Sequence, residues 1–197
     1  MRFVASFLVL VFSMSTAMAD KLPLKEISQY LNAMTSAEAA FTQLNDDGTI
    51  STGKLYIKRP GKMRFEYDPP EKAVVMATNN TVIVYDPKSN QQAEKYPLRR
   101  TPLSIILARR VDLDQARMVV DHGFDGTATS VTAQDPKNPE YGSIQLNFTG
   151  NPVELRQWIV NDANGGQTTV ILRDLQTGGQ LPNSLFNINE FERLNDR

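Results

Sequence analysis

The chain has 197 residues, of which 41% are hydrophobic and 22% charged, with 21 Lys and Arg against 22 Asp and Glu. This length suits one globular domain with a sizeable core, and the nearly balanced charge gives no reason to expect a nucleic-acid partner. The absence of cysteine excludes disulfides, thiolate chemistry and cysteine-based metal sites, and the single histidine excludes a histidine-rich metal cluster.

Residues 1–19 have the pattern of a secretory signal peptide. Arg2 is followed by an apolar run over 3–12 and then by Ala17-Met18-Ala19, the small-x-small pattern of a cleavage site. The run is shorter than the roughly 20 residues that a membrane span needs, which disfavours an uncleaved anchor helix. We therefore expect cleavage after Ala19 and a single exported domain over 20–197.

The mature chain is predicted to begin with one amphipathic helix over 23–35, because Leu24, Ile27, Leu31 and Met34 recur at helical spacing. After this helix the period changes to two, and turns rich in Pro, Gly and Asn separate short strands. The predicted strands are 53–59, 63–67, 73–77, 81–85, 91–96, 118–120, 127–132, 143–148, 155–160, 168–175 and 186–190. Their connections are too short for crossover helices, so we expect an antiparallel sheet of about ten strands.

Residues 101–108 interrupt the strand pattern with a very apolar stretch. Thr101 as N-cap and Pro102 at the first helical position predict a helix, and Arg109-Arg110 would fall in its last turn, where cations suit the helix dipole. A second short helix could begin at Asp112. An apolar helix at this place either plugs one end of the sheet as permanent core or forms a removable cover over a cavity.

The alternation along the strands predicts one wide apolar face. Ile144, Leu146 and Phe148 share a face of their strand, and Leu55 and Ile57 share a face with Arg59. With few helices to cover it, such a face requires either a second sheet packed against it or a sheet that curls around a hollow. The periodicity alone does not separate these two architectures.

No residue pattern typical of catalysis stands out. His122 lies in the predicted turn 121–124, and the sequence contains no serine elbow to pair with it. The acidic pairs Asp46-Asp47, Asp112/Asp114 and Glu190/Glu192 are typical of solvated loops. We therefore expect neither an enzyme nor a cofactor or metal site; an exported hydrolase that uses one of these carboxylates or His122 is the alternative.

Two arginine pairs, Arg99-Arg100 and Arg109-Arg110, flank the apolar stretch. They suit an acidic partner or lipid head groups, and they equally suit a solvated rim with no partner. The charge pattern alone does not choose between these interpretations.

Several motifs, in their order along the chain, resemble the LolA family of periplasmic lipoprotein carriers. They are Phe41-Thr42-Gln43, Gly53-x-Leu55-x-Ile57-Lys58-Arg59-Pro60-Gly61-x-Met63-Arg64-Phe65-x-Tyr67-x-x-Pro70, Val84-Tyr85-Asp86-Pro87 and Thr101-Pro102-Leu103. The resemblance covers 22–190 and is densest over 41–107. It implies a mainly β fold, an incomplete, half-open antiparallel β-barrel whose mouth is covered by an N-terminal helix and by central-loop helices that act as a lid.

The resemblance also implies roles for particular residues. The arginine that locks the lid in the family falls on Arg59. The implied lipid-binding cavity is lined by Leu55, Ile57, Met63, Phe65, Tyr67, Val75 and Ile83, and the implied lid contributes Pro102, Leu103, Ile106 and Leu107. The chain departs from the family at its C-terminus, because members often end with a Gly-Val-Asp strand and this chain ends with the different sequence of 191–197.

By this resemblance the protein is a non-enzymatic periplasmic chaperone and carrier, a monomer without a cofactor. It would bind the acyl chains of lipoproteins in its cavity and shuttle them from the inner to the outer membrane. The implied partners are acylated lipoproteins, an inner-membrane Lol ABC exporter and an outer-membrane lipoprotein receptor. The alternative is a periplasmic sensor or regulatory module that binds lipidated or misfolded envelope proteins on the same fold.

Overall fold

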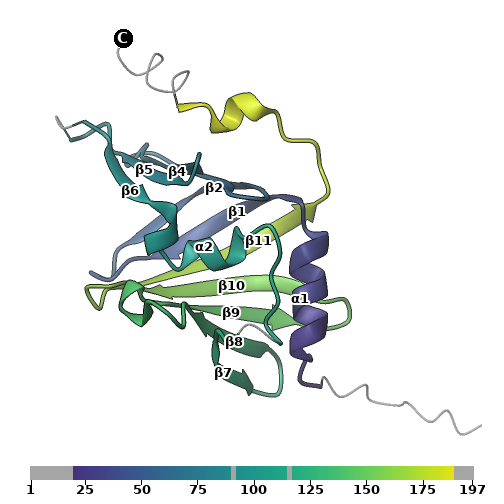
Figure 1. Cartoon of the computed structure of the whole chain (residues 1–197). Helices are drawn as coiled ribbons and strands as arrows, with labels where there is room; N and C mark the ends of the chain where they lie inside the picture. Colours follow the sequence, from purple (N-terminus) through teal and green to yellow (C-terminus); the bar gives the residue numbers. More distant parts are fainter. Residues whose placement is uncertain (1–19, 90–91, 115–116, 189–197) are drawn as a thin grey trace, which may run out of the picture.

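The computed structural model describes residues 20–89, 92–114 and 117–188 (Figure 1). The predicted signal peptide over 1–19 and the atypical C-terminal residues 191–197 lie outside these ranges. The predictions made for these two segments therefore remain predictions.

Eleven strands form one antiparallel sheet, with the order β6-β5-β4-β3-β2-β1-β11-β10-β9-β8-β7. Within the described residues the two edge strands, β6 and β7, do not pair with each other, so the barrel is incomplete, as the fold class predicted. The strands are β1 Ser36–Leu44, β2 Ile50–Lys58, β3 Lys62–Tyr67, β4 Val74–Thr78, β5 Thr81–Tyr85, β6 Glu94–Pro97, β7 Val119–Phe124, β8 Thr129–Gln134, β9 Ser143–Thr149, β10 Glu154–Asn161 and β11 Gln167–Thr177.

β1 is the strand that the sequence pattern missed. Its residues Ser36–Leu44 include three alanines and a glutamate, which are depleted in strands. The segment becomes a strand because both of its edges are paired: Phe41 lies opposite Gly53 of β2 on one side and opposite Leu172 of β11 on the other. β1 thereby joins the N-terminal and C-terminal halves of the sheet.

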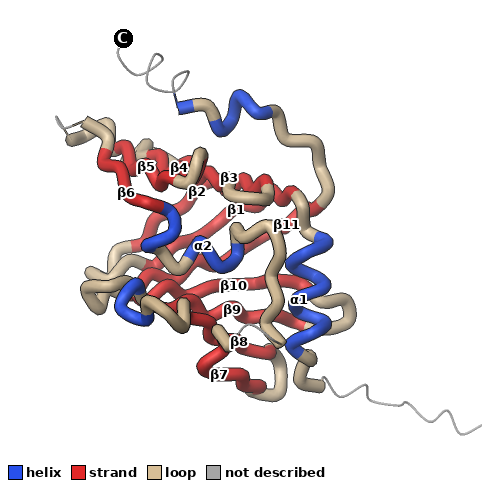
Figure 2. Tube along the Cα trace, in the orientation of Figure 1, coloured by secondary structure: helices blue, strands red, loops and turns tan. Residues whose placement is uncertain are grey.

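The concave face of the sheet holds the main core. The helices α1 (Leu24–Ala33) and α2 (Leu103–Ile106) lie across this face (Figures 1 and 2). Their apolar side chains pack into one cluster with the inward-facing strand residues. A fully buried Leu or Ile contributes about 1.5–3 kcal/mol. Because α1 has no side-chain cap, this packing is the main force that holds it in place.

The segment between β6 and β7 contains less helix than predicted. We call residues 98–113 the lid segment. Leu98–Arg100 forms a 3-10 turn, and α2 is one turn long. The predicted N-cap is wrong, because Pro102 occupies that position and the Thr101 hydroxyl donates to the carbonyl oxygen of Leu98 at 2.8 Å. No helix begins at Asp112 within the described residues of this segment.

α2 is short because tertiary hydrogen bonds take the backbone groups that would extend it. In a longer helix the Leu107 carbonyl would accept a bond from the Val111 N–H. Instead it accepts one from the Gly61 N–H at 2.9 Å. The predicted placement of Arg109-Arg110 in the last helical turn is therefore wrong, since both arginines lie beyond the helix end.

The outer face of the sheet carries a second, smaller cluster. The predicted strand over 186–190 is wrong in its described part, because the chain forms a 3-10 helix over Asn183–Phe186. The Phe186 ring packs there against Val74 and Met76 of β4. The C-terminal segment therefore crosses the outside of the sheet, on the side opposite to the helices (Figure 1).

Candidate functional site

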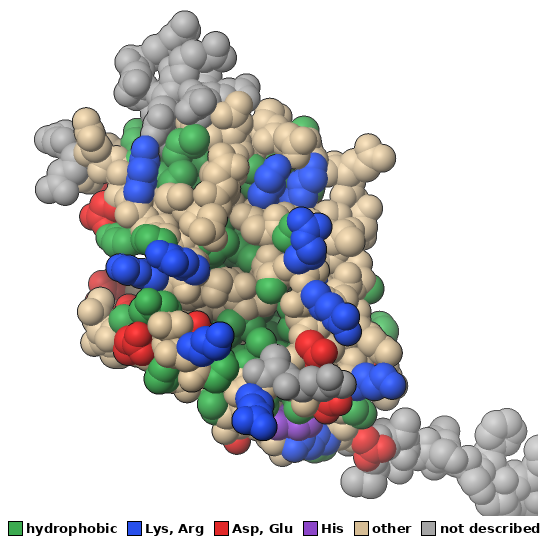
Figure 3. Space-filling view, in the orientation of Figure 1, with side chains coloured by type: hydrophobic (Ala, Val, Ile, Leu, Met, Phe, Trp, Pro, Cys, Tyr) green, Lys and Arg blue, Asp and Glu red, His purple; other side chains and the backbone are tan. Residues whose placement is uncertain are grey.

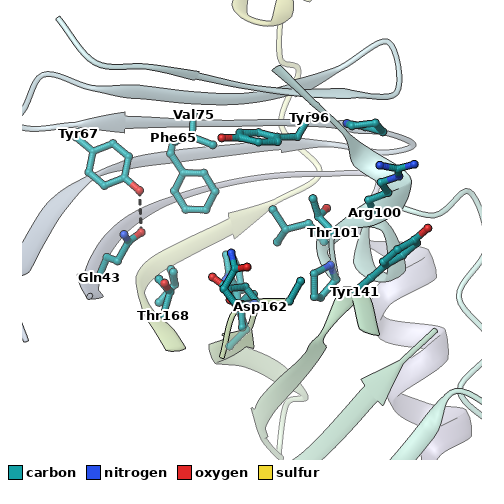
Figure 4. Close-up of a pocket in the computed structure, with 18 residues that line it drawn as sticks. Gln43, Phe65, Tyr67, Val75, Tyr96, Arg100, Thr101, Tyr141, Asp162 and Thr168 are labelled. Carbon is teal, nitrogen blue, oxygen red and sulfur yellow. Dashed lines mark hydrogen bonds between the residues drawn. The ribbon is translucent and has the colours of Figure 1, made fainter. Parts of the chain in front are cut away.

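An apolar cavity lies between the lid segment and the concave face of the sheet. Its volume is about 550 Å³, within the range of roughly 300–1,000 Å³ that is typical of ligand pockets. Figure 4 shows the side chains around it. The lining residues are Gln43, Phe65, Tyr67, Val75, Tyr96, Pro97, Arg100, Thr101, Pro102, Leu103, Tyr141, Trp158, Val160, Asp162, Ala163, Asn164, Thr168 and Val170.

Strand register places the large apolar side chains of this wall together. Phe65 of β3 lies opposite Val75 of β4, and Trp158 of β10 lies opposite Val170 of β11. Residues directly opposite in antiparallel strands project to the same side of the sheet. The rings of Phe65 and Trp158 meet edge to face with 6.2 Å between their centroids. The cavity therefore has a continuous apolar wall that runs from one half of the sheet to the other.

The wall also carries the half-buried hydroxyl group of Tyr67. The Tyr67 hydroxyl donates to Oε1 of Gln43 at 2.8 Å, and Nε2 of Gln43 donates to Oδ1 of Asn45 at 2.6 Å. Burial raises the pKa of Tyr67 from 10.0 to about 12. Tyr67 is therefore neutral at physiological pH and adds no charge to the wall.

The rim of the cavity consists of exposed residues, among them Tyr96, Arg100, Asp162 and Asn164. The Asp162 carboxylate is tied to its own turn, because Oδ1 accepts the backbone N–H groups of Asn164 at 2.7 Å and Gly166 at 3.0 Å. Arg100 forms no ion pair with any residue that the structure describes. It thus supplies a positive charge to the rim (Figure 4).

The residues that the resemblance assigned to cavity and lid fall into three groups. Phe65, Tyr67, Val75, Pro102 and Leu103 line the cavity. A second group is buried in the same core cluster but does not line the cavity, and this group comprises Leu55, Ile57, Met63, Ile106 and Leu107. Contact of either group with a lipid remains a prediction.

Ile83 forms the third group, and its placement in the cavity wall is wrong. It lies opposite Met76, whose side chain belongs to the outer cluster with Phe186. Val75 instead lies opposite Val84. With the two-residue turn Asn79-Asn80 between β4 and β5, Val75 and Ile83 cannot share a face, so the sequence already contained the signal that excludes Ile83.

Arg59 follows the end of β2 and reaches the lid segment. Its Nη2 donates to the carbonyl oxygen of Ala108 at 2.7 Å and lies 3.5 Å from Oδ1 of Asn32. Its Nε is buried and has no partner among the described residues. Burial lowers the pKa of Arg59 below its ordinary value, although a guanidinium stays charged at any physiological pH.

Two polar side chains of α1 hold the same segment. Asn32 forms a pair of hydrogen bonds with the backbone of Val111, donating to its oxygen at 2.7 Å and accepting from its nitrogen at 2.9 Å. Oγ of Ser28, one helical turn earlier, accepts the Leu113 N–H at 3.0 Å. We call Ser28, Asn32, Arg59 and Gly61 the latch residues, because each bonds the backbone of 107–113.

Sequence reasoning missed three of the latch residues and part of the cavity wall. Ser28 and Asn32 are four residues apart, next to the apolar stripe that contains Ile27 and Leu31, and this spacing is the one signal that they share a helix face. Nothing local marks Gly61 as a lid contact. Trp158 and Val170 lie on predicted strands, but only the β10–β11 register brings them into the wall.

Other features of the described residues do not add a site. His122, predicted in a turn, lies within β7, where its Nε2 is 3.0 Å from the carbonyl oxygen of Leu22. Over residues 20–89, 92–114 and 117–188, no group of three or more His, Asp or Glu side chains could hold a metal ion. Within the same ranges, no helix is both long and apolar enough to cross a membrane.

The family profile and the relatives that match this chain belong to the same family. The sequence profile of the family described as "Outer membrane lipoprotein carrier protein LolA" matches residues 32–189. The outer-membrane lipoprotein carrier protein of Chromohalobacter salexigens is 28% identical over 184 residues, which cover 87% of this chain and 84% of that protein. That of Azotobacter vinelandii is 24% identical over 168 residues, which cover 81% and 80%.

Solved structures share the fold. A putative outer membrane lipoprotein-sorting protein domain from Vibrio parahaemolyticus superposes with a TM-score of 0.52 at 12% identity, covering 88% of this chain and 98% of that one. A DUF1329 family protein from Desulfovibrio piger superposes with a TM-score of 0.50 at 12% identity, covering 84% and 95%. At this identity the likeness concerns the fold alone.

Proposed function

Since the chain belongs to the LolA family of outer-membrane lipoprotein carrier proteins, we propose that its cavity holds lipoprotein acyl chains during transfer from the inner to the outer membrane. The family and the relatives are named as outer-membrane lipoprotein carrier proteins, and we propose that this chain likewise carries its cargo without catalysing a reaction. The observation that carries the proposal is the apolar cavity between the lid segment and the sheet, bordered by Phe65, Trp158 and Leu103.

The free energy of transferring the acyl chains of the cargo into water limits how such a carrier can work. Burying one methylene group gains about 0.8 kcal/mol, so three acyl chains represent on the order of 30 kcal/mol against water. Non-covalent affinities reach at most about 18–21 kcal/mol. Release into water followed by rebinding is therefore not a usable route. The cargo passes directly between apolar sites, and the carrier needs only an intermediate affinity.

The latch residues set that intermediate affinity. A hydrogen bond from a charged donor is worth about 1.5–3 kcal/mol, and Arg59 makes one to Ala108. The buried, unpartnered Nε of the same guanidinium costs about 1–3 kcal/mol and offsets part of this gain. The closed state is therefore favoured only modestly, and a full load of acyl chains can displace the lid segment. When the cargo leaves, the latch reforms.

The proposal includes the route and the partners. Residues 1–19 direct export, cleavage follows Ala19, and residues 20–197 act as one monomeric carrier domain in the periplasm. An inner-membrane Lol ABC exporter loads the lipoprotein, and an outer-membrane receptor takes it. Arg99, Arg100, Arg109 and Arg110 are exposed on the lid segment, and we expect the partners to meet this part of the surface. Several Lys and Arg side chains lie on the face of the molecule seen in Figure 3.

The experiment is co-purification with a lipoprotein whose lipidated cysteine is intact, compared with the same lipoprotein after Cys→Ser. We expect a one-to-one soluble complex with the acylated protein and none with the unacylated one. Equal capture of both forms would show that the carrier recognises the polypeptide, which would overturn the assignment of the cavity to acyl chains.

A further inference from the structure

The cavity and the latch lie toward opposite ends of α2. The residues of the lid segment that line the cavity are Arg100, Thr101, Pro102 and Leu103, which precede or begin the helix. The latch bonds go to the backbone of 107–113, which follows it. No latch residue lines the cavity. A ligand can therefore enter the cavity without breaking a latch bond.

The core residues beside the cavity are tightly packed in this closed state. Leu55, Ile57 and Met63 of the sheet and Ile106 and Leu107 of the lid segment are each at most 2% exposed and belong to one packed cluster. Space for further chains requires this packing to separate, which also requires the latch to open. The open cavity, at about 550 Å³, has the size of a site for one small ligand.

The chemistry of the cavity specifies a type of ligand. Its wall is apolar, with Phe65, Val75 and Trp158 lining the space. Its exposed rim carries Arg100, which forms no ion pair with any carboxylate in the described part of the chain. The competing carboxylate, Asp162, already accepts two backbone N–H groups of its turn. Because Asp162 is held by its own turn, Arg100 is the lining residue that can pair with a ligand, and an apolar space beside it suits one hydrocarbon chain with an anionic head group.

We infer that the latched protein binds one single-chain anionic amphiphile in this cavity, with the chain against Trp158 and the head group at Arg100. The inference rests on the proposed function and refines it. The same site would take the first acyl chain of a lipoprotein before the latch opens, and the remaining chains would enter after it opens. Loading then has two stages, and only the second stage breaks the hydrogen bond between Arg59 and the lid segment.

The test uses palmitate and the full mature chain. Trp158 is the one tryptophan of the sequence and lines the cavity, so its fluorescence reports occupancy directly. We expect saturable, one-to-one binding of palmitate. Hydrogen exchange measured on the same complex should show that the amides of Gly61, Val111 and Leu113 stay as protected as in the free protein. A triacylated lipoprotein should expose all three amides.

Two variants locate the ligand. Val75→Phe fills the cavity, and since two excluded methylene groups cost about 1.6 kcal/mol, palmitate affinity should fall about tenfold or more. Ile171→Phe, on the exposed face of β11 beside Val170, is the matched control. Arg100→Gln should weaken palmitate about two- to fivefold, as expected for an exposed ion pair, and leave the neutral monopalmitoylglycerol unchanged. This surface variant keeps the test valid if Val75→Phe does not fold.

The outcomes separate the inference from the proposed function. If lipoprotein binds and palmitate does not, or if palmitate exposes the latch amides, the two-stage inference is wrong and the carrier function stands. If neither binds, the proposed function fails as well. Equal loss of palmitate affinity in Val75→Phe and Ile171→Phe would place the ligand outside this cavity and overturn the inference.

Discussion

Nη2 of Arg59 lies 2.7 Å from the carbonyl oxygen of Ala108, so a side chain at the end of β2 is bonded to the backbone just beyond α2. The same guanidinium lies 3.5 Å from Oδ1 of Asn32, which itself accepts the Val111 N–H. Sheet, lid segment and α1 therefore meet at one point. A substitution at Arg59 or Asn32 therefore affects the contacts between the sheet, the lid segment and α1.

Arg59→Leu is expected to keep the fold and to retain acylated cargo longer. The substitution removes a charged hydrogen bond worth about 1.5–3 kcal/mol to the closed state, together with the partly offsetting cost of the unpartnered Nε. Transfer of a lipoprotein to a purified acceptor should therefore slow about three- to tenfold. The control is Arg173→Leu, because Arg173 is exposed on the outer face of β11, away from the lid segment. An unchanged transfer rate in Arg59→Leu would show that Arg59 is not the lock.

Asn32→Ala is expected to loosen the lid segment locally. Each of the two hydrogen bonds to Val111 contributes about 0.5–1.5 kcal/mol, so losing both costs about 1–3 kcal/mol. The Val111 amide should therefore exchange about 5- to 150-fold faster in native-state hydrogen exchange. The Leu113 amide, which Ser28 holds, is the internal reference and should change less. The idea fails if both amides accelerate equally or if neither changes.

Gly53→Ala is expected to destabilise the sheet strongly. An added Cβ would lie 2.0 Å from the backbone oxygen of Glu66 and 2.8 Å from Cε1 of Phe41, and neither atom can withdraw from a paired strand. We expect a loss of about 3 kcal/mol or more in the free energy of unfolding. Gly179→Ala, where no atom lies within 4 Å, should change it by less than about 1 kcal/mol. Similar urea midpoints for the two variants would contradict this packing.

Tyr67 is expected to make the protein less stable in alkaline solution. Its pKa is raised by burial from 10.0 to about 12, so the folded state keeps the proton that the unfolded state loses. The contribution is full below pH 10 and is lost as the pH rises to about 12, amounting to about 2–3 kcal/mol. Tyr67→Phe should remove this part of the pH dependence of the free energy of unfolding. If the free energy of unfolding of Tyr67→Phe falls with pH as steeply as that of the wild type, the effect comes from other tyrosines.

Much of the fold could be predicted from the sequence because it is encoded locally. Alternation in β2 and β3, and the Asn79-Asn80 turn with φ of 47° and 61°, depend on neighbouring residues only, and both predictions are confirmed. β1 could not be predicted in this way. Its alanine-rich sequence becomes a strand through pairing with β11, more than a hundred residues later in the chain.

The lid segment also depends on contacts with residues that are distant in the sequence, which a local pattern does not encode. Its apolar composition predicted that it packs on the apolar face of the sheet, as permanent core or as a cover, and the packing is confirmed. Its helix is nevertheless one turn long, because Gly61, Arg59 and Asn32 take the backbone groups of 107–111. No local signal encodes such bonds. The Ile83 error has a different origin, since the turn length between β4 and β5 already fixed its face. That residue could have been placed correctly from the sequence.

The most direct measurement is photocrosslinking to the acyl chain of a bound lipoprotein. A photoreactive phenylalanine analogue at Phe65, inside the cavity, is expected to crosslink to the lipid of an acylated cargo. The same analogue at Ile171, on the exposed face of β11, should give none. Lipid adducts at Ile171 but not at Phe65 would mean that the fatty chains travel on the outside of the sheet, and the cavity would lose its assigned role.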